Sequence, residues 1–209
     1  MSDSVYLSNS FETHLHPILQ PPAFNHRPIV INVNSFAEDS IADFRDYMQE
    51  ASDSGQPRVQ IYIDSFGGDV YALIGMMEII KNSPIPVDTI CTTKAMSCGA
   101  CLFVMGESRY ISPEATLMFH DFQQSISDNT PVTHIAEHAR EGQDMREKVM
   151  TLIDDKRGKK EGTLEKKLKE HGSWFLNANE AKKENFCDYI GPAPKMVVEV
   201  RCDITFREQ

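Results

Sequence analysis

The chain has 209 residues and a formal net charge of −10, and 41% of its residues are hydrophobic. This length allows one domain with a sizeable core, and the acidic balance argues against nucleic acid as a partner. No apolar run approaches the roughly 20 residues that span a membrane, and residues 1–27 lack the basic start and apolar core of a signal peptide. We therefore expect a cytoplasmic protein.

From residue 28 onward, apolar runs typical of buried strands alternate with stretches of helical spacing. Strand-like runs lie at 28–33, 59–63, 87–91 and 115–119, and helices are predicted near 41–51, 70–82 and 98–105. This order predicts an α/β fold with a largely parallel sheet and flanking helices. We expect an extended N-terminal arm at 1–27, a main domain at 28–194 and a C-terminal β-like tail at 195–209.

A long helix is predicted from Thr130 and Pro131, which suit its start, to about Arg157, before Gly158. Its apolar face is thin, consisting of Ile135, Ala139, Met145, Val149 and Leu152. Such a helix packs only partly on its own domain and protrudes. A half-buried long helix suits a contact between subunits.

The stretch KAMSCGA at 94–100 is the strongest candidate for chemistry. It follows a buried strand and opens a helix, so Ser97 would lie where backbone N–H groups are unpaired and the helix dipole is positive. Small neighbours such as Gly99 let a substrate approach. Because a hydroxyl alone is a poor nucleophile, this hypothesis requires a histidine base and donors for an oxyanion.

Both requirements have candidates in the sequence. The strand at 59–63 runs into paired glycines, Gly67 and Gly68, which allow an exposed turn whose amides can face a ligand. The strand at 115–119 ends at His120. Ser97 and His120 would then lie at the carboxyl ends of neighbouring strands, where ligands bind in open α/β sheets.

Three motifs occur in a fixed order: YIDSFGG at 62–68, AMSCGA at 95–100 and LMFH at 117–120. They resemble the glycine turn, the nucleophile block and the histidine strand of the Clp protease proteolytic subunit (ClpP) family, self-compartmentalising serine peptidases with a crotonase-like fold. The resemblance runs from about residue 27 to about residue 191 and includes FLNANEA at 175–181. It implies a ClpP/crotonase-like fold for the domain at 28–194, with the long helix as the contact between two rings.

Residue by residue, the resemblance implies Ser97 as the nucleophile, His120 as the base, and the backbone amides of Gly68 and Cys98 as the oxyanion hole. The third member of the triad does not carry over, because Ser173 stands where the family has an aspartate. In chymotrypsin, replacing that acid by its amide lowers turnover about 10⁴-fold.

Several groups are candidates to orient His120 instead. Ser173 would act through its hydroxyl or a water, and three further side chains come from the same region: Glu170, Asn177 and Asp188. Asp121 is not expected to reach His120, because neighbours on a strand point to opposite faces. The third catalytic residue is left open.

The resemblance implies a serine endopeptidase that acts on unfolded proteins or peptides inside a homo-oligomer, as a heptameric ring or double ring, with an AAA+ unfoldase as a candidate partner. No cofactor or metal is expected. One alternative, motivated by Ser173, is a weak or inactive subunit that assembles with an active paralogue. Another is a crotonase-fold thioester enzyme, but such an enzyme needs no Ser–His pair.

Three other patterns suggest different chemistry. Lys94 precedes Ser97 by three residues, as in a Ser–Lys dyad, but a solvated or capping lysine is the more ordinary interpretation. Cys98 and Cys101 form C-x-x-C at a helix start, a redox pattern, although five cysteines, three in apolar runs, favour buried reduced thiols. The residues HIAEH at 134–138 fit a zinc pattern whose third ligand would be Glu199 or Glu208. Surface histidines are the simpler explanation.

Overall fold

The computed structural model describes residues 28–123 and 131–197. Within them, Ile29–Ala193 form a compact unit. The expected arm at 1–27, Thr130 and residues 198–209 of the expected tail lie outside the described residues.

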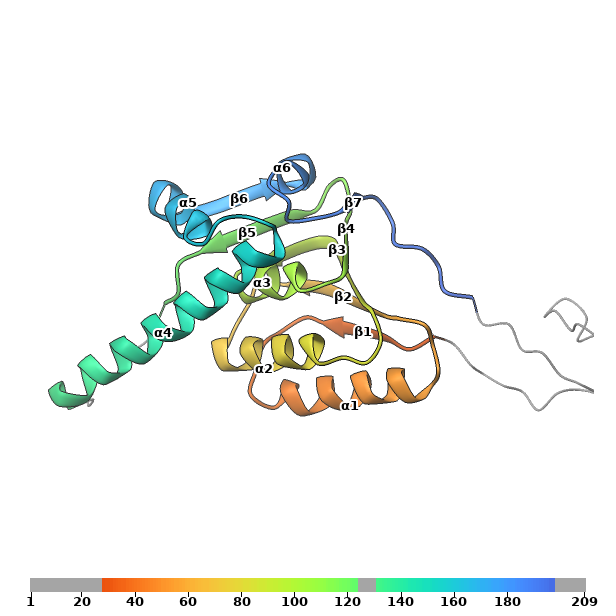
Figure 1. The fold of residues 1–209 in the computed structure, drawn as a ribbon, viewed down its shortest axis with the longest axis horizontal. Coiled ribbons are helices and arrows are strands. Elements are labelled where there is room, and N and C mark those ends of the chain that lie inside the picture. Colours follow the sequence, from red (N-terminus) through yellow and green to blue (C-terminus); the bar gives the residue numbers. More distant parts are fainter. Residues whose placement is uncertain (1–27, 124–130, 198–209) are drawn as a thin grey trace, which may run out of the picture. The chain divides into compact units, whose positions relative to one another are not determined.

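Helices and strands alternate along the first half of the unit, as the sequence predicts, and the fold is α/β with a mostly parallel sheet (Figure 1). The elements are β1 (Val30–Val33), α1 (Ser40–Asp53), β2 (Val59–Ser65), α2 (Val70–Lys81), β3 (Val87–Met96), α3 (Cys98–Val104), β4 (Ser108–Ile111), β5 (Thr116–His120), α4 (Val132–Lys156), α5 (Thr163–His171), β6 (Ser173–Asn177), α6 (Ala178–Lys183) and β7 (Tyr189–Ile190).

The strand β3 is the branch point of the sheet. Its first half pairs in parallel with β4, from Asp88 to Cys91, and its second half pairs in parallel with β5, from Lys94 to Met96. The predicted strand at 87–91 was too short, because the pairing with β5 extends it by five residues to Met96. This extension brings the ends of β3 and β5 together.

The structure contains three strands that hydrophobic patterning does not predict. β4 and β7 are short and pair with each other in parallel. β6 pairs antiparallel with β5, from Asn177 opposite Thr116 to Ser173 opposite His120. Only Leu176 of β6 is buried, so the strand lacks the apolar alternation that would identify it.

The helix α4 protrudes from the unit, as expected (Figure 1). The side chains described between 134 and 141 are all exposed, whereas Val149, Met150 and Ile153 are buried against the core. In the part of the chain that the structure describes, the first half of the helix therefore packs little on the unit, and Tyr71 of α2 contacts it by donating to Glu141 Oε1 at 2.6 Å. Within the described residues, no helix is both long and apolar enough to cross a membrane.

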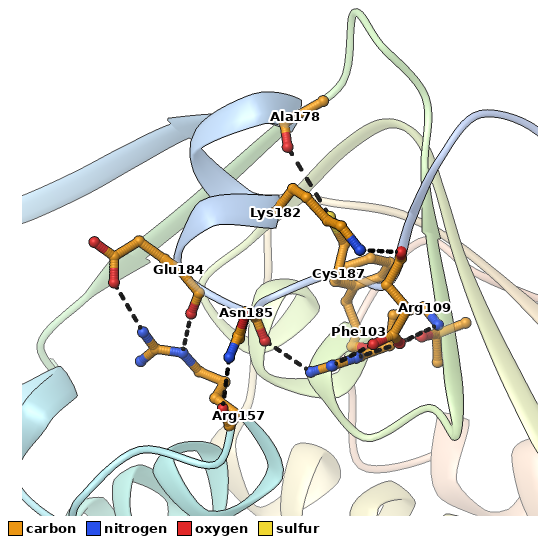
Figure 2. A network of polar contacts seen from close by, with 10 residues as sticks. Phe103, Arg109, Arg157, Ala178, Lys182, Glu184, Asn185 and Cys187 are labelled. Atoms are coloured by element: carbon orange, nitrogen blue, oxygen red, sulfur yellow. Dashed lines mark hydrogen bonds and ion pairs between the residues drawn. The ribbon is translucent and has the colours of Figure 1, made fainter.

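A polar network fixes the segment after α6 against the rest of the unit (Figure 2). Arg157 Nε donates to the backbone oxygen of Glu184 (3.0 Å), and Arg109 Nη1 donates to the backbone oxygen of Asn185 (3.0 Å). Arg109 also binds both carboxylate oxygens of Asp188, at 2.8 Å each. Arg157 is 2% exposed and burial lowers its pKa to about 10, so it remains charged at neutral pH.

The same segment supports the end of β5 by ring packing. Phe186 stacks on Phe119 with ring centroids 4.3 Å apart, and the guanidinium of Arg157 lies 3.7 Å from the centroid of the Phe186 ring. Phe119 immediately precedes His120. The core therefore holds the last residues of β5 in place, and with them the backbone of His120.

Candidate active site

Ser97 lies on a strained turn between β3 and α3. Its φ is 53° and its ψ is −121°, a positive φ that is uncommon for any residue other than glycine. The Ser97 N–H donates to the backbone oxygen of Met118 on β5 (2.8 Å), and its carbonyl accepts from Cys101 N (3.1 Å). These bonds maintain the strained conformation, which is the kind of backbone that gathers at functional sites.

The glycine turn after β2 packs directly against this serine. Gly67 has a φ of +109°, and a Cβ added there would lie 2.7 Å from Cβ and 3.1 Å from Oγ of Ser97. Gly68 has a φ of +152°, and a Cβ there would lie 2.4 Å from the backbone oxygen of Phe36. Only glycine fits at both positions, which explains the paired glycines in chemical terms.

The two groups expected to form an oxyanion hole are neighbours in space. Cys98 is the first residue of α3, where backbone N–H groups have no partner inside the helix. Its thiol donates to the backbone oxygen of Gly68, with the sulfur 3.2 Å from that oxygen. The start of α3 and the glycine turn are thus joined beside Ser97.

His120 ends β5 and is partly buried. It lines a small cavity of about 10 Å³ together with Ser97. The other side chains around this cavity are apolar or sulfur-bearing: Cys101, Phe119, Phe122, Val149, Met150, Ile153, Leu164 and Leu168. Among the described residues, Ser97 and His120 share a cavity wall but form no hydrogen bond with each other.

The ring of His120 turns toward its own chain. Its Nδ1 lies 2.5 Å from the backbone oxygen of Asp121, while the Asp121 carboxylate binds Arg146 on α4. The expectation that the Asp121 side chain does not reach His120 therefore agrees with the geometry. The backbone contact was not predicted, because residue patterns carry no information about carbonyl directions.

The other candidates for orienting His120 have different surroundings. Ser173 is exposed and lies directly opposite His120 in the β5–β6 pair. Asn177 accepts from Glu180 N (3.0 Å) as the cap of α6, and Asp188 binds Arg109. Glu170 is exposed near the end of α5. Of these residues, Ser173 alone is paired with His120.

The contacts of Lys94 and of the two cysteines give little support to a Ser–Lys dyad or to a redox C-x-x-C site. Lys94 binds Asp64 with an Nζ–Oδ1 distance of 2.5 Å, and its ammonium lies 4.5 Å from the centroid of the Phe66 ring. Cys98 and Cys101 are buried, and burial raises the pKa of both thiols, the opposite of what redox cysteines need.

The histidines of the zinc pattern, His134 and His138, are exposed on α4. Their suggested third ligands, Glu199 and Glu208, lie outside the described residues. Within the part of the chain that is described, no cluster of three or more His, Cys, Asp or Glu side chains is arranged to hold a metal ion. We therefore assign no zinc site to these histidines.

The mostly parallel sheet brings three features together: a serine on a strained strand-to-helix turn, a close-packed glycine turn, and a histidine that ends the adjacent strand. Comparison with known proteins gives the family. A model of the Clp protease family matches residues 24–193, and the chain belongs to this family. The ATP-dependent Clp protease proteolytic subunit of Deinococcus radiodurans is 29% identical over 142 residues, which cover 66% of this chain and 67% of that protein.

Proposed function

We propose that this chain is a serine endopeptidase of the ClpP type, which hydrolyses peptide bonds of unfolded proteins through Ser97 and His120. Membership of the Clp protease family supports a peptidase. The observation that carries the residue assignment is the packing of Ser97, on a strained turn, against Gly67 and beside the end of β5.

In this mechanism Ser97 Oγ attacks the peptide carbonyl while His120 Nε2 takes its proton. The negative charge on the carbonyl oxygen is stabilised by the amides of Gly68 and Cys98. His120 then protonates the leaving amine, and a water molecule activated by the same imidazole hydrolyses the ester on Ser97. The substrate lies extended between the segments that follow Gly68 and His120, with main-chain hydrogen bonds providing affinity.

We further propose that the chain assembles into a heptameric ring or double ring, with an AAA+ unfoldase as a partner. The first half of α4 supports a contact between subunits, because the side chains described from 134 to 141 are all exposed and the hydrogen bond from Tyr71 to Glu141 leaves most of that surface uncovered. The native mass of the assembly tests this part of the proposal. A mass equal to one chain at micromolar concentration would contradict it.

Ser173 favours one second candidate, a catalytically weak or inactive subunit that assembles with an active paralogue. Both candidates place the same residues in the same fold, and they differ in the turnover of the chain itself and in whether it assembles with a paralogue. Without an acid hydrogen-bonded to the ring of His120, the imidazolium formed in the reaction is less stabilised.

Hydrolysis of a short fluorogenic peptide separates these candidates, because a short peptide needs no unfolding. The comparison is between the full chain and its Ser97→Ala variant, at equal concentrations and with the same native mass. The proposal predicts hydrolysis by the full chain that falls to background in Ser97→Ala. An intact assembly with no hydrolysis above that variant would favour the inactive subunit.

A further inference from the structure

One arginine connects the end of β5 to two helices. Arg146 on α4 donates from Nε to Asp121 Oδ1 at 2.5 Å and from Nη1 to Glu165 Oε1 of α5 at 3.1 Å. The Arg146 side chain is 18% exposed. A guanidinium that is largely shielded from water and binds two carboxylates holds both in fixed directions.

The same carboxylate also fixes a peptide plane. Asp121 Oδ1 accepts from the N–H of Phe122 at 2.8 Å. That N–H and the carbonyl of Asp121 belong to one peptide unit, which is planar. The direction of the Asp121 carbonyl is therefore set by the carboxylate, and through it by Arg146.

This carbonyl is the group that His120 contacts, with Nδ1 2.5 Å from the oxygen. A carbonyl oxygen only accepts hydrogen bonds, so Nδ1 carries the proton when the imidazole is neutral. Nε2 is then unprotonated, which is the tautomer that a general base needs to take a proton from a serine. In a Ser–His–Asp triad the acid has this role.

We propose that Arg146 and Asp121 are positioning residues for His120. Their ion pair fixes the Asp121–Phe122 peptide, and the carbonyl of that peptide selects the His120 tautomer with the proton on Nδ1. An aspartate at position 173, where this chain has Ser173, would select the same tautomer. This inference rests on the proposed role of His120 as the base. In this role both side chains act through His120. The carbonyl orients the ring but carries no full charge, so it replaces only part of what a carboxylate supplies.

The charged groups around His120 come from its own segment and from two packed helices. Asp121 follows it in sequence, Arg146 approaches from α4, and Glu165 from α5 binds both Arg146 and Lys169. Removal of Arg146 leaves the Asp121 carboxylate beside His120 without its counter-charge, whereas removal of Asp121 leaves the Arg146 guanidinium there with Glu165 as its remaining partner. The two removals therefore have opposite electrostatic effects on His120.

The test uses Arg146→Gln and Asp121→Asn in the full chain, with the exposed residue Arg140 on the same helix changed to Gln as the control. Carbethoxylation of His120 by diethylpyrocarbonate at pH 6, followed by peptide mass spectrometry, measures the reactivity of the imidazole without any need for catalysis. The rate is expected to fall in Arg146→Gln and to rise in Asp121→Asn, each by about 2-fold or more, because the remaining carboxylate favours the unreactive charged ring and the remaining guanidinium disfavours it. Arg140→Gln is expected to match the parent.

The second readout is the rate at which a fluorophosphonate labels Ser97. Both variants are expected to react about 10-fold more slowly than Arg140→Gln, or slower still. Unchanged His120 reactivity, changes of the same sign in both variants, or labelling rates equal to those of a labelled Arg140→Gln control would overturn the inference. If Arg146→Gln does not fold, Asp121→Asn at its exposed position decides alone. A folded parent chain that is never labelled would instead refute the proposed function, and the inference with it, whereas a labelled parent with unchanged variants would refute the inference alone.

Discussion

His120 and Ser173 lie directly opposite each other in the antiparallel pair of β5 and β6. Opposed residues of such a pair project to the same face of the sheet, with Cβ atoms about 4.5–5.5 Å apart. A side chain at position 173 is therefore within reach of the His120 ring. The departure from the family pattern is a change of one side chain on a framework that still presents it to the histidine.

Ser173→Asp is expected to raise the rate of peptide hydrolysis by about 10-fold or more, because a carboxylate at this position stabilises the imidazolium form of His120. Ser173→Asn is the matched control, since it has the same shape and no charge. The measurement is the turnover of a short fluorogenic peptide by both variants. Equal rates for the two would show that position 173 does not act as the acid.

Gly67→Ala is expected to reduce fluorophosphonate labelling of Ser97 by about 100-fold or more, because the new Cβ would overlap the Cβ of Ser97. Gly55 provides the control. It has a φ of +76° and nothing within 4 Å of an added Cβ, so Gly55→Ala carries backbone strain without any contact with the site. Both variants are expected to lose about 1 kcal/mol of stability from that strain. Normal labelling of Gly67→Ala would contradict the close packing of Gly67 against Ser97.

The four described cysteines are expected to resist iodoacetamide in the folded protein at pH 8. Burial raises the pKa of Cys91 to about 12 and that of Cys187 to about 11, and it also raises the pKa of Cys98 and Cys101. The reactive thiolate is scarce when the pKa lies well above the pH. Peptide mass spectrometry after alkylation, with and without urea, measures the effect. Rapid alkylation of Cys98 without urea would revive a redox role for the C-x-x-C pattern.

Asp188→Asn is expected to lower the free energy of unfolding at pH 7 by about 1–3 kcal/mol, because Arg109 would remain buried without its counter-charge. Burial disfavours the Asp188 carboxylate, but hydrogen bonds from Arg109 outweigh it and hold the pKa of Asp188 below its ordinary value. Urea denaturation of the parent and the variant measures the difference.

The pH dependence of this effect has a definite sign. A carboxylate whose pKa is lower in the folded state stabilises the protein above its ordinary pKa of about 4, and the stabilisation is lost as the pH falls through the folded value. The difference between parent and Asp188→Asn should therefore shrink below about pH 4. The exposed pair of Glu78 and Lys81 is the comparison, since Glu78→Gln should cost less than about 0.5 kcal/mol at any pH. A difference that stays constant down to pH 2 would contradict the ion-pair account.

The sequence predicts most of the first half of the fold, because its strands are apolar and buried and its helices have regular apolar spacing. The run at 59–63 lies within β2, and the stretch at 70–82 corresponds to α2. β6 could not be found in this way, since four of its five side chains are partly or fully exposed. Its place in the sheet comes from pairing with β5, a long-range interaction that local periodicity does not report.

The candidate site also has some residues that local sequence identifies and some contacts that it does not. Ser97, Gly67 and His120 are identifiable from short motifs, because their chemistry depends on residue type. The contact between His120 and the Asp121 carbonyl is a backbone interaction, and Arg146 reaches Asp121 across 25 positions in the sequence. Neither relationship leaves a pattern in the sequence, so only the folded structure could reveal them.

The most direct test of the central claim is the intact mass of the full chain after reaction with a fluorophosphonate probe, with Ser97→Ala and His120→Ala as controls. An activated serine requires both a nucleophile and a base, so we expect one probe per chain in the parent and none in either variant. A folded parent that stays unlabelled, or labelling that survives in Ser97→Ala, would contradict the claim that Ser97 and His120 form a working catalytic pair.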